Sequence, residues 1–209
     1  MGKALDKLLQ HPAIWRGDQK IHTKQHSLPS GIAALDALLP GGGWPMGALT
    51  EIIVEREGIG ELRLIMPALA KLSQQRCLAW ITPPYIPYAP ALAAYQIDLT
   101  KVLLIHPGAS DDNYFWVMEQ TLRSGACGGT LFWPDERGLR QYKQHELRRL
   151  QLAAEVGQAW GVLFLSERTA LQASPAALRL HLAPTPKGLA LHILKRRGGW
   201  ATGPVYLDL

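Results

Sequence analysis

The feature that most constrains the fold is a buried-strand pattern that leads through a glycine turn into a helical pattern. Residues 48–54 are apolar and rich in β-branched side chains, which is typical of a strand buried on both faces. The stretch Glu57-Gly58-Ile59-Gly60 then provides a tight turn, and apolar residues recur at helical spacing over 61–75. Pro67 lies inside that helical pattern, and we expect it to kink the helix. The unit predicts an α/β protein.

The alternation of strands and helices continues along the chain. We expect strands at 76–82, 102–106, 129–133 and 161–166, and helices at 30–39 (with Ser30 as N-cap), 91–96, 111–124 and 136–160. Three more strands, at 178–183, 189–195 and 204–209, follow without helices between them. The pattern therefore predicts a mainly parallel sheet flanked by helices, with an antiparallel C-terminal edge.

The chain divides into two parts. Residues 1–26 are expected to form an N-terminal amphipathic arm and linker, which either packs on the main domain or docks on a partner. Residues 27–209 are expected to form the core domain. With 22 Lys and Arg against 17 Asp and Glu, the net charge is +5, which is compatible with nucleic acid or an acidic partner.

Composition also argues against several kinds of protein. The sequence has two cysteines, no metal-ligand spacing and no apolar run of membrane-spanning length. It begins without the long apolar stretch of a secretion signal. We therefore expect a cytoplasmic protein with no metal site and no membrane segment.

The glycine turn has the topology of a phosphate-binding loop but not its chemistry. A working loop of this kind needs a lysine for the phosphates and a Ser or Thr hydroxyl for magnesium. Glu61 stands at the lysine position and Leu62 at the hydroxyl position. A carboxylate repels a triphosphate, and leucine cannot ligate a metal. The simplest interpretation is a turn of that shape that holds no ligand.

Two sequence runs resemble a known family. Residues 30–39, followed by Gly41-Gly42-Gly43-Trp44-Pro45-Met46-Gly47 and a strand ending in Glu51-Ile52, resemble the opening of the RecA recombinase core. Within that superfamily the chain is most similar to ImuA, a short RecA-like protein that lacks the ATPase residues and is related to SulA. Residues 131–135 and 195–197 carry the same resemblance. The fold class it implies is a RecA-like core with a degenerate P-loop.

The resemblance implies a function in the DNA-damage response. ImuA proteins support mutagenic translesion synthesis together with RecA, the polymerase-like protein ImuB and, indirectly, an error-prone DnaE-type polymerase. We therefore expect a non-catalytic accessory protein that bridges RecA and an ImuB-type partner. The alternatives are a SulA-like inhibitor of the tubulin-like division GTPase and an ATP-dependent recombination mediator.

Mapping the RecA motifs onto the chain indicates further losses. The glutamate that activates water falls at Pro83 or Pro84, and the glutamine that senses the γ-phosphate falls near Glu167. Asp135 stands at the end of the Walker-B-like strand, where it could hold magnesium weakly, although such an aspartate is more often a turn residue. We therefore expect no enzymatic activity and no cofactor.

Basic and aromatic residues are candidates for docking a partner or DNA. The two DNA-binding loops of RecA correspond to 134–140 and 168–175, which are short here, so direct and weak DNA binding stays open against a solvated helix face. The candidate docking residues are Arg148, Arg149, Lys195, Arg196, Arg197 and Trp200. Among the other tryptophans, we expect Trp80, Trp116, Trp133 and Trp160 in the core, and Trp15 and Trp44 at less certain burial.

Overall fold

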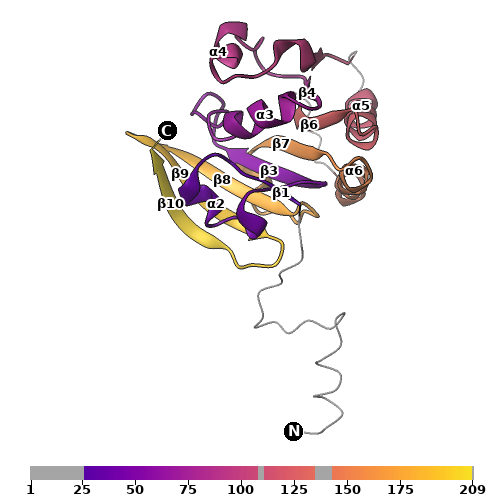
Figure 1. Ribbon diagram of the computed structural model, residues 1–209. Helices are drawn as coiled ribbons and strands as arrows, with labels where there is room; N and C mark the ends of the chain where they lie inside the picture. The colour runs from indigo at the N-terminus through magenta and orange to yellow at the C-terminus, as the bar shows by residue number, and fades with distance from the viewer. Residues whose placement is uncertain (1–25, 108–110, 135–142, 209) are drawn as a thin grey trace, which may run out of the picture.

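An eight-stranded sheet forms the centre of the molecule (Figure 1). The computed structural model describes residues 26–107, 111–134 and 143–208, so the expected N-terminal arm lies outside the described residues except for His26. The strand order is β10-β9-β8-β3-β7-β6-β4-β5. The strands are β3 (Ala48–Val54), β4 (Cys77–Ile81), β5 (Val102–Ile105), β6 (Cys127–Phe132), β7 (Trp160–Ser166), β8 (Leu178–Thr185), β9 (Gly188–Arg196) and β10 (Thr202–Asp208).

The sheet has the expected mixed topology. The pairs β3–β7, β3–β8, β7–β6, β6–β4 and β4–β5 are parallel, whereas β8–β9 and β9–β10 are antiparallel. A separate two-stranded sheet pairs β1 (Ser27–Leu28) with β2 (Trp44–Pro45). The prediction of a mainly parallel sheet with an antiparallel C-terminal edge is confirmed.

Helices cover both faces of the sheet, as Figure 1 shows. The helices α2 (Ala33–Asp36), α3 (Met66–Ser73) and α4 (Ala89–Ala94) contribute to one hydrophobic cluster, and α5 (Asp111–Arg123) and α6 (Gln144–Gly157) contribute to the other. Short 3-10 turns lie at Pro40–Gly42, Leu99–Lys101 and Glu167–Thr169. β3 is buried along its whole length because it has strands on both sides and apolar clusters on both faces.

Two helix starts differ from expectation. α3 begins at Met66 rather than at residue 61, because Pro67 has no N–H to donate to the carbonyl four residues earlier. Proline is tolerated in the first helical turn, where this bond is absent anyway. Ser30 is not the N-cap of α2: that position is Ile32, and the Ser30 hydroxyl accepts the Ile32 N–H at 3.1 Å. The part of the expected helix 136–160 that precedes residue 143 lies outside the described residues.

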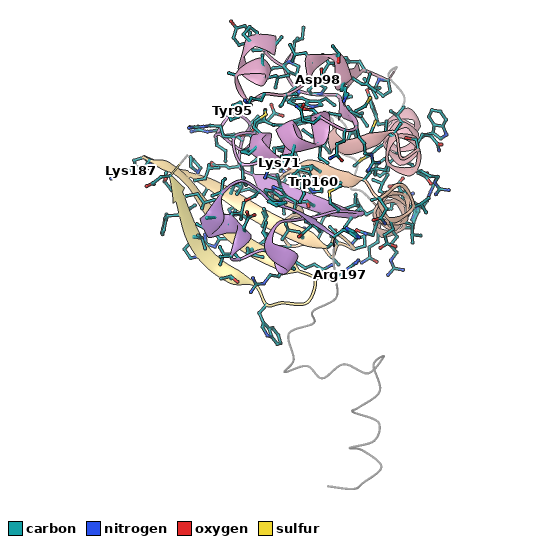
Figure 2. The ribbon with its side chains drawn as sticks, viewed as in Figure 1. Lys71, Tyr95, Asp98, Trp160, Lys187 and Arg197 are labelled. Carbon is teal, nitrogen blue, oxygen red and sulfur yellow. The ribbon has the colours of Figure 1, made fainter. Side chains whose placement is uncertain are left out.

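Tryptophans fill much of the core on the α3 side. Trp44 is fully buried and stacks on Trp160 with ring centroids 5.0 Å apart. The Trp160 indole N–H donates to the Thr50 hydroxyl at 2.9 Å, deep between the sheet and the helices (Figure 2). The expected burial of Trp80, Trp133 and Trp160 is confirmed.

One tryptophan that we expected in the core is not there. Trp116 is 60% exposed, so this prediction is wrong. Its neighbours Phe115, Met118 and Leu122 already fill the side of α5 that faces the sheet. A helix packs one face on a sheet, and Trp116 lies on the other face.

Replacing Trp44 by alanine tests the stacked pair. We expect Trp44→Ala to lower the free energy of unfolding by about 3–5 kcal/mol, because it leaves a large cavity beside Trp160. Urea denaturation followed by circular dichroism measures this loss. The matched control is Trp200→Ala, which removes a side chain that is 82% exposed and should change stability by less than about 0.5 kcal/mol. Equal losses in the two variants would contradict the packing described above.

Candidate functional site

The glycine turn lies directly after β3, at the carboxyl end of the parallel strands. In open α/β sheets this edge is where ligands bind. Gly58 and Gly60 have φ values of 79° and 103°, so both positions require glycine. The turn therefore has the backbone conformation of a potential anion-binding loop.

The Glu61 carboxylate accepts hydrogen bonds from the backbone of this turn. Its Oε1 accepts the Gly58 N–H at 3.2 Å, and its Oε2 accepts the Gly60 N–H at 3.1 Å. Glu61 is only 5% exposed. The carboxylate thus occupies two of the backbone N–H groups that a bound phosphate could use in a loop of this shape.

The surroundings of the turn carry charges of both signs, since the Arg63 side chain lies beside Gly60 and acids precede Gly58. Leu62 packs against the hydrophobic cluster on the α3 side, so it offers no hydroxyl to a metal ion. The exposed stretch before Gly58 contains Glu55 and Glu57, with Arg56 between them. A ligand phosphate would have to displace the Glu61 carboxylate and then lie among these acids.

The next strand ends without a catalytic acid. Pro83 is buried and Pro84 is exposed after β4, and the preceding Thr82 donates its hydroxyl to the carbonyl of Trp133. This bond ties the end of β4 to the end of β6. The candidate magnesium ligand Asp135 lies outside the described residues.

A buried ion pair holds the segment that joins β7 to β8. That segment crosses β3, because β3 lies between the two strands. Glu51 of β3 is 1% exposed and its Oε2 accepts from Arg179 Nε of β8 at 2.5 Å. The remaining guanidinium nitrogens donate to the carbonyls of Thr169 and Gln172 at 2.9 and 2.8 Å, and the Ser174 hydroxyl donates to Glu51.

Glu167, which we expected near the position of the RecA γ-phosphate sensor, interacts with a histidine of β8. Its Oε1 lies 2.7 Å from Nε2 of His181 on β8, and the His181 ring contacts that of His192 on β9. The residue is exposed. Glu167 therefore binds a side chain of β8, the strand at which the antiparallel edge of the sheet begins.

The basic residues at the end of β9 do not form one patch. Lys195 Nζ donates to the Ser174 carbonyl at 2.6 Å, and burial lowers the pKa of this lysine, partly offset by the nearby Glu51. Arg196 points to the other face of the sheet and donates to the carbonyl of Leu38. Arg197 lies 3.8 Å from Glu155 of α6 and is half exposed. Their docking role stays a prediction, but two of the three already bind the protein's own backbone.

The remaining candidates are distributed over the surface. Arg148 and Arg149 are exposed on α6, where Arg149 pairs with Glu119 of α5. Lys187, another basic residue of the C-terminal part of the chain, lies at the opposite end of β9 from Arg197 (Figure 2). Trp200 is exposed in the connection between β9 and β10.

Sequence reasoning missed the pairing of Glu51 with Arg179. The available signal was a single acid inside the apolar run 48–54, since a charge buried in a central strand requires a partner. Arg179, 128 positions later, could not be identified as that partner without the strand order.

Within the described ranges, no three His, Cys, Asp or Glu side chains are grouped to hold a metal ion. No helix in this part of the chain is long and apolar enough to cross a membrane.

Comparison with known proteins points to RecA. The chain is 28% identical to RecA of Lactobacillus delbrueckii subsp. bulgaricus over 125 residues, which is 59% of this chain and 37% of the relative. It is 27% identical to RecA of Lactobacillus johnsonii over 125 residues, 34% of that protein. The chain thus spans about a third of the length of the curated relatives it matches. No family model matches.

Among solved structures, the chain is similar to SulA from Pseudomonas aeruginosa. The TM-score is 0.43 and the sequence identity is 21%, over 56% of this chain and 97% of that chain.

Removing the Glu61 carboxylate should open the turn to an anion. We expect Glu61→Ala to lower the free energy of unfolding by about 1–3 kcal/mol, because two N–H groups lose a charged acceptor. Added pyrophosphate should then raise the melting temperature of this variant but not that of the wild type. Glu55→Ala, which removes an exposed acid from the same turn, is the matched control and should show neither effect. If pyrophosphate raised the melting temperature of the wild type as much as that of Glu61→Ala, the Glu61 carboxylate would not be keeping anions out of the turn.

Breaking the buried ion pair should be costly. Arg179→Ala is expected to lower the free energy of unfolding by about 3–5 kcal/mol, because it leaves Glu51 charged and without its cationic partner. The exposed Arg168→Ala serves as control and should be near neutral in the same urea titration. Combining Glu51→Leu with Arg179→Met should recover part of the loss, since no charge is then buried. A double variant less stable than Arg179→Ala would contradict this explanation.

Proposed function

We propose that this protein is a RecA-like accessory protein of the DNA-damage response that works without nucleotide turnover. The observation that carries the proposal is the Glu61 carboxylate, which accepts both the Gly58 and the Gly60 N–H. A chain with this turn presents a RecA-type topology while the anion donors of the turn are already occupied. Its surfaces would then be available to partners regardless of the nucleotide supply.

The cellular context of the proposal comes from sequence similarity. The relatives described above are RecA proteins, and the similarity covers 59% of this chain. We assign the protein to the ImuA type on the residues of the opening run 30–52 and on the replacements at Glu61 and Leu62. Its role is to bridge RecA and an ImuB-type polymerase homologue during mutagenic translesion synthesis, with the DnaE-type polymerase recruited indirectly.

Binding measurements with purified proteins test this role. The full-length protein is immobilised, and RecA and the ImuB-type homologue of the same organism are passed over it with and without Mg-ATP. We expect both to bind with micromolar or tighter affinity. The affinity of the ImuB-type homologue should be unchanged by Mg-ATP.

A genetic assay provides the second readout. Deletion of the gene should abolish the rise in mutation frequency after ultraviolet irradiation, and a Glu61→Gln allele should restore it. Absence of binding to both partners, together with inhibition of the tubulin-like division GTPase, would overturn the proposal in favour of a SulA-like role.

A further inference from the structure

The outer surface of the α5–α6 layer carries three large apolar side chains that are more than half exposed. Trp116 of α5 is 60% exposed, and Leu152 and Val156 of α6 are 57% and 69% exposed. Each lies on a helix whose other face is fully used against the sheet. Large apolar side chains grouped on a helix surface often mark an interaction site.

Helical spacing and one ion pair place these side chains on a common strip. α5 and α6 lie side by side (Figure 1), and Glu119 of α5 binds Arg149 of α6 where the helices meet. Trp116 lies three positions before Glu119, and Leu152 lies three positions after Arg149, so each is one turn from the pair. Val156 follows Leu152 by one further turn. Because α5 and α6 connect parallel strands, they run in the same direction, so the strip from Trp116 to Val156 is apolar at its two ends and is crossed by the Glu119–Arg149 pair.

The charge beside this strip is positive. Glu119 is shared by Arg123, at 3.0 Å, and by Arg149, and its side chain is only 10% exposed, whereas those of Arg123 and Arg149 are 50% and 62% exposed. Arg148 is exposed one position before Arg149. Two solvent-facing guanidinium groups thus share one largely buried carboxylate.

The nearest exposed acid on α6 does not neutralise the strip. Glu155 accepts from Gln151 at 3.0 Å and lies 3.8 Å from Arg197 at the end of β9. Gln151 is buried against the sheet, so Glu155 lies on the β9 side of α6, away from α5. Among the described side chains, Gln120 is an exposed, uncharged neighbour of Trp116, and Glu155, three positions after Leu152, is the exposed acid of this region, already engaged by Gln151 and Arg197.

We propose that this strip is a docking surface for an acidic amphipathic helix of a partner protein. The apolar face of such a helix would cover Trp116, Leu152 and Val156, and its carboxylates would pair with Arg148 and Arg149. Tryptophan and arginine side by side are the combination that dominates the energetics of most protein interfaces. The surface does not depend on the role assigned under Proposed function, because it lies outside the glycine turn and the β9 basic residues.

Defined peptides test the chemistry of this surface. The probes are three labelled 18-residue peptides: one with leucines at helical spacing and glutamates elsewhere, one with the same leucines and lysines elsewhere, and one with the acidic composition in scrambled order. Fluorescence anisotropy with the full-length protein measures binding, and circular dichroism measures peptide helicity. The acidic helix is expected to bind with micromolar affinity and to gain helicity, while the other two bind at least tenfold more weakly.

Matched variants locate the binding site. Trp116→Ala and Leu152→Ala should weaken binding of the acidic helix by tenfold or more. Val156→Glu should also weaken binding, because the new carboxylate repels the acidic helix. Residue 156 is solvent-facing, so this variant should fold and test the proposal even if Trp116→Ala does not. Leu171→Ala and Tyr206→Ala remove exposed side chains elsewhere and should leave the affinity unchanged.

Three outcomes would overturn the proposal. The first is equal affinity for the acidic and basic helices, or no saturable binding of the acidic helix. The second is tighter binding of a single-stranded oligonucleotide that depends on Arg148 and Arg149 but not on Leu152, which would make the face a nucleic-acid surface. The third is a dimer by light scattering that Trp116→Ala abolishes, which would make the occupant a second copy of this chain.

Discussion

The ion pair between Glu51 and Arg179 is the interaction on which the arrangement of the site depends. β3 must accept β7 on one side and β8 on the other, so the chain has to cross β3 between those two strands. The described segment 167–177 that makes this crossing contains the 3-10 turn Glu167–Thr169 but no α-helix; Arg179 and Lys195 donate to its backbone carbonyls, and Glu51 accepts from Arg179. A buried charge pair satisfied by further hydrogen bonds fixes one arrangement of the loop, because each alternative leaves a charge without a partner.

Glu61 and Glu51 both stabilise the unit formed by β3 and the glycine turn. Each carboxylate is buried and accepts hydrogen bonds from the protein itself: Glu51 from the crossing segment and its arginine, and Glu61 from the glycine turn. In a nucleotide-binding protein the turn is held by the phosphates it binds. Here the chain provides its own anion, so the turn keeps its shape without a ligand. This is the physical basis of the accessory role that we propose, in which partners bind a fixed surface.

Much of the fold was readable from the sequence because the pattern was local. The apolar run 48–54 predicted β3 with its bounds, and the end of the strand–helix alternation at 178 predicted the antiparallel edge. The replacement of a phosphate-binding lysine by Glu61 was also visible. What could not be predicted was where the replacing side chain points, since that depends on the φ values of Gly58 and Gly60 and on the turn that follows.

Lys195, Arg196 and Arg197 are adjacent in sequence, but strand alternation sends Arg196 to the opposite face. The burial of Trp44 and Trp116 also depends on the fold: Trp44, whose burial the sequence left open, lies in the core, and Trp116, expected in the core, lies on the outer face of its helix.

The most direct test of the account is a titration of the wild-type protein with a fluorescent ATP analogue in the presence of magnesium. The account predicts no saturable binding at micromolar nucleotide, because the Glu61 carboxylate already accepts the N–H groups of Gly58 and Gly60. Saturation in the micromolar range, competed by unlabelled ATP, would mean that the carboxylate yields to phosphate and would contradict the central claim.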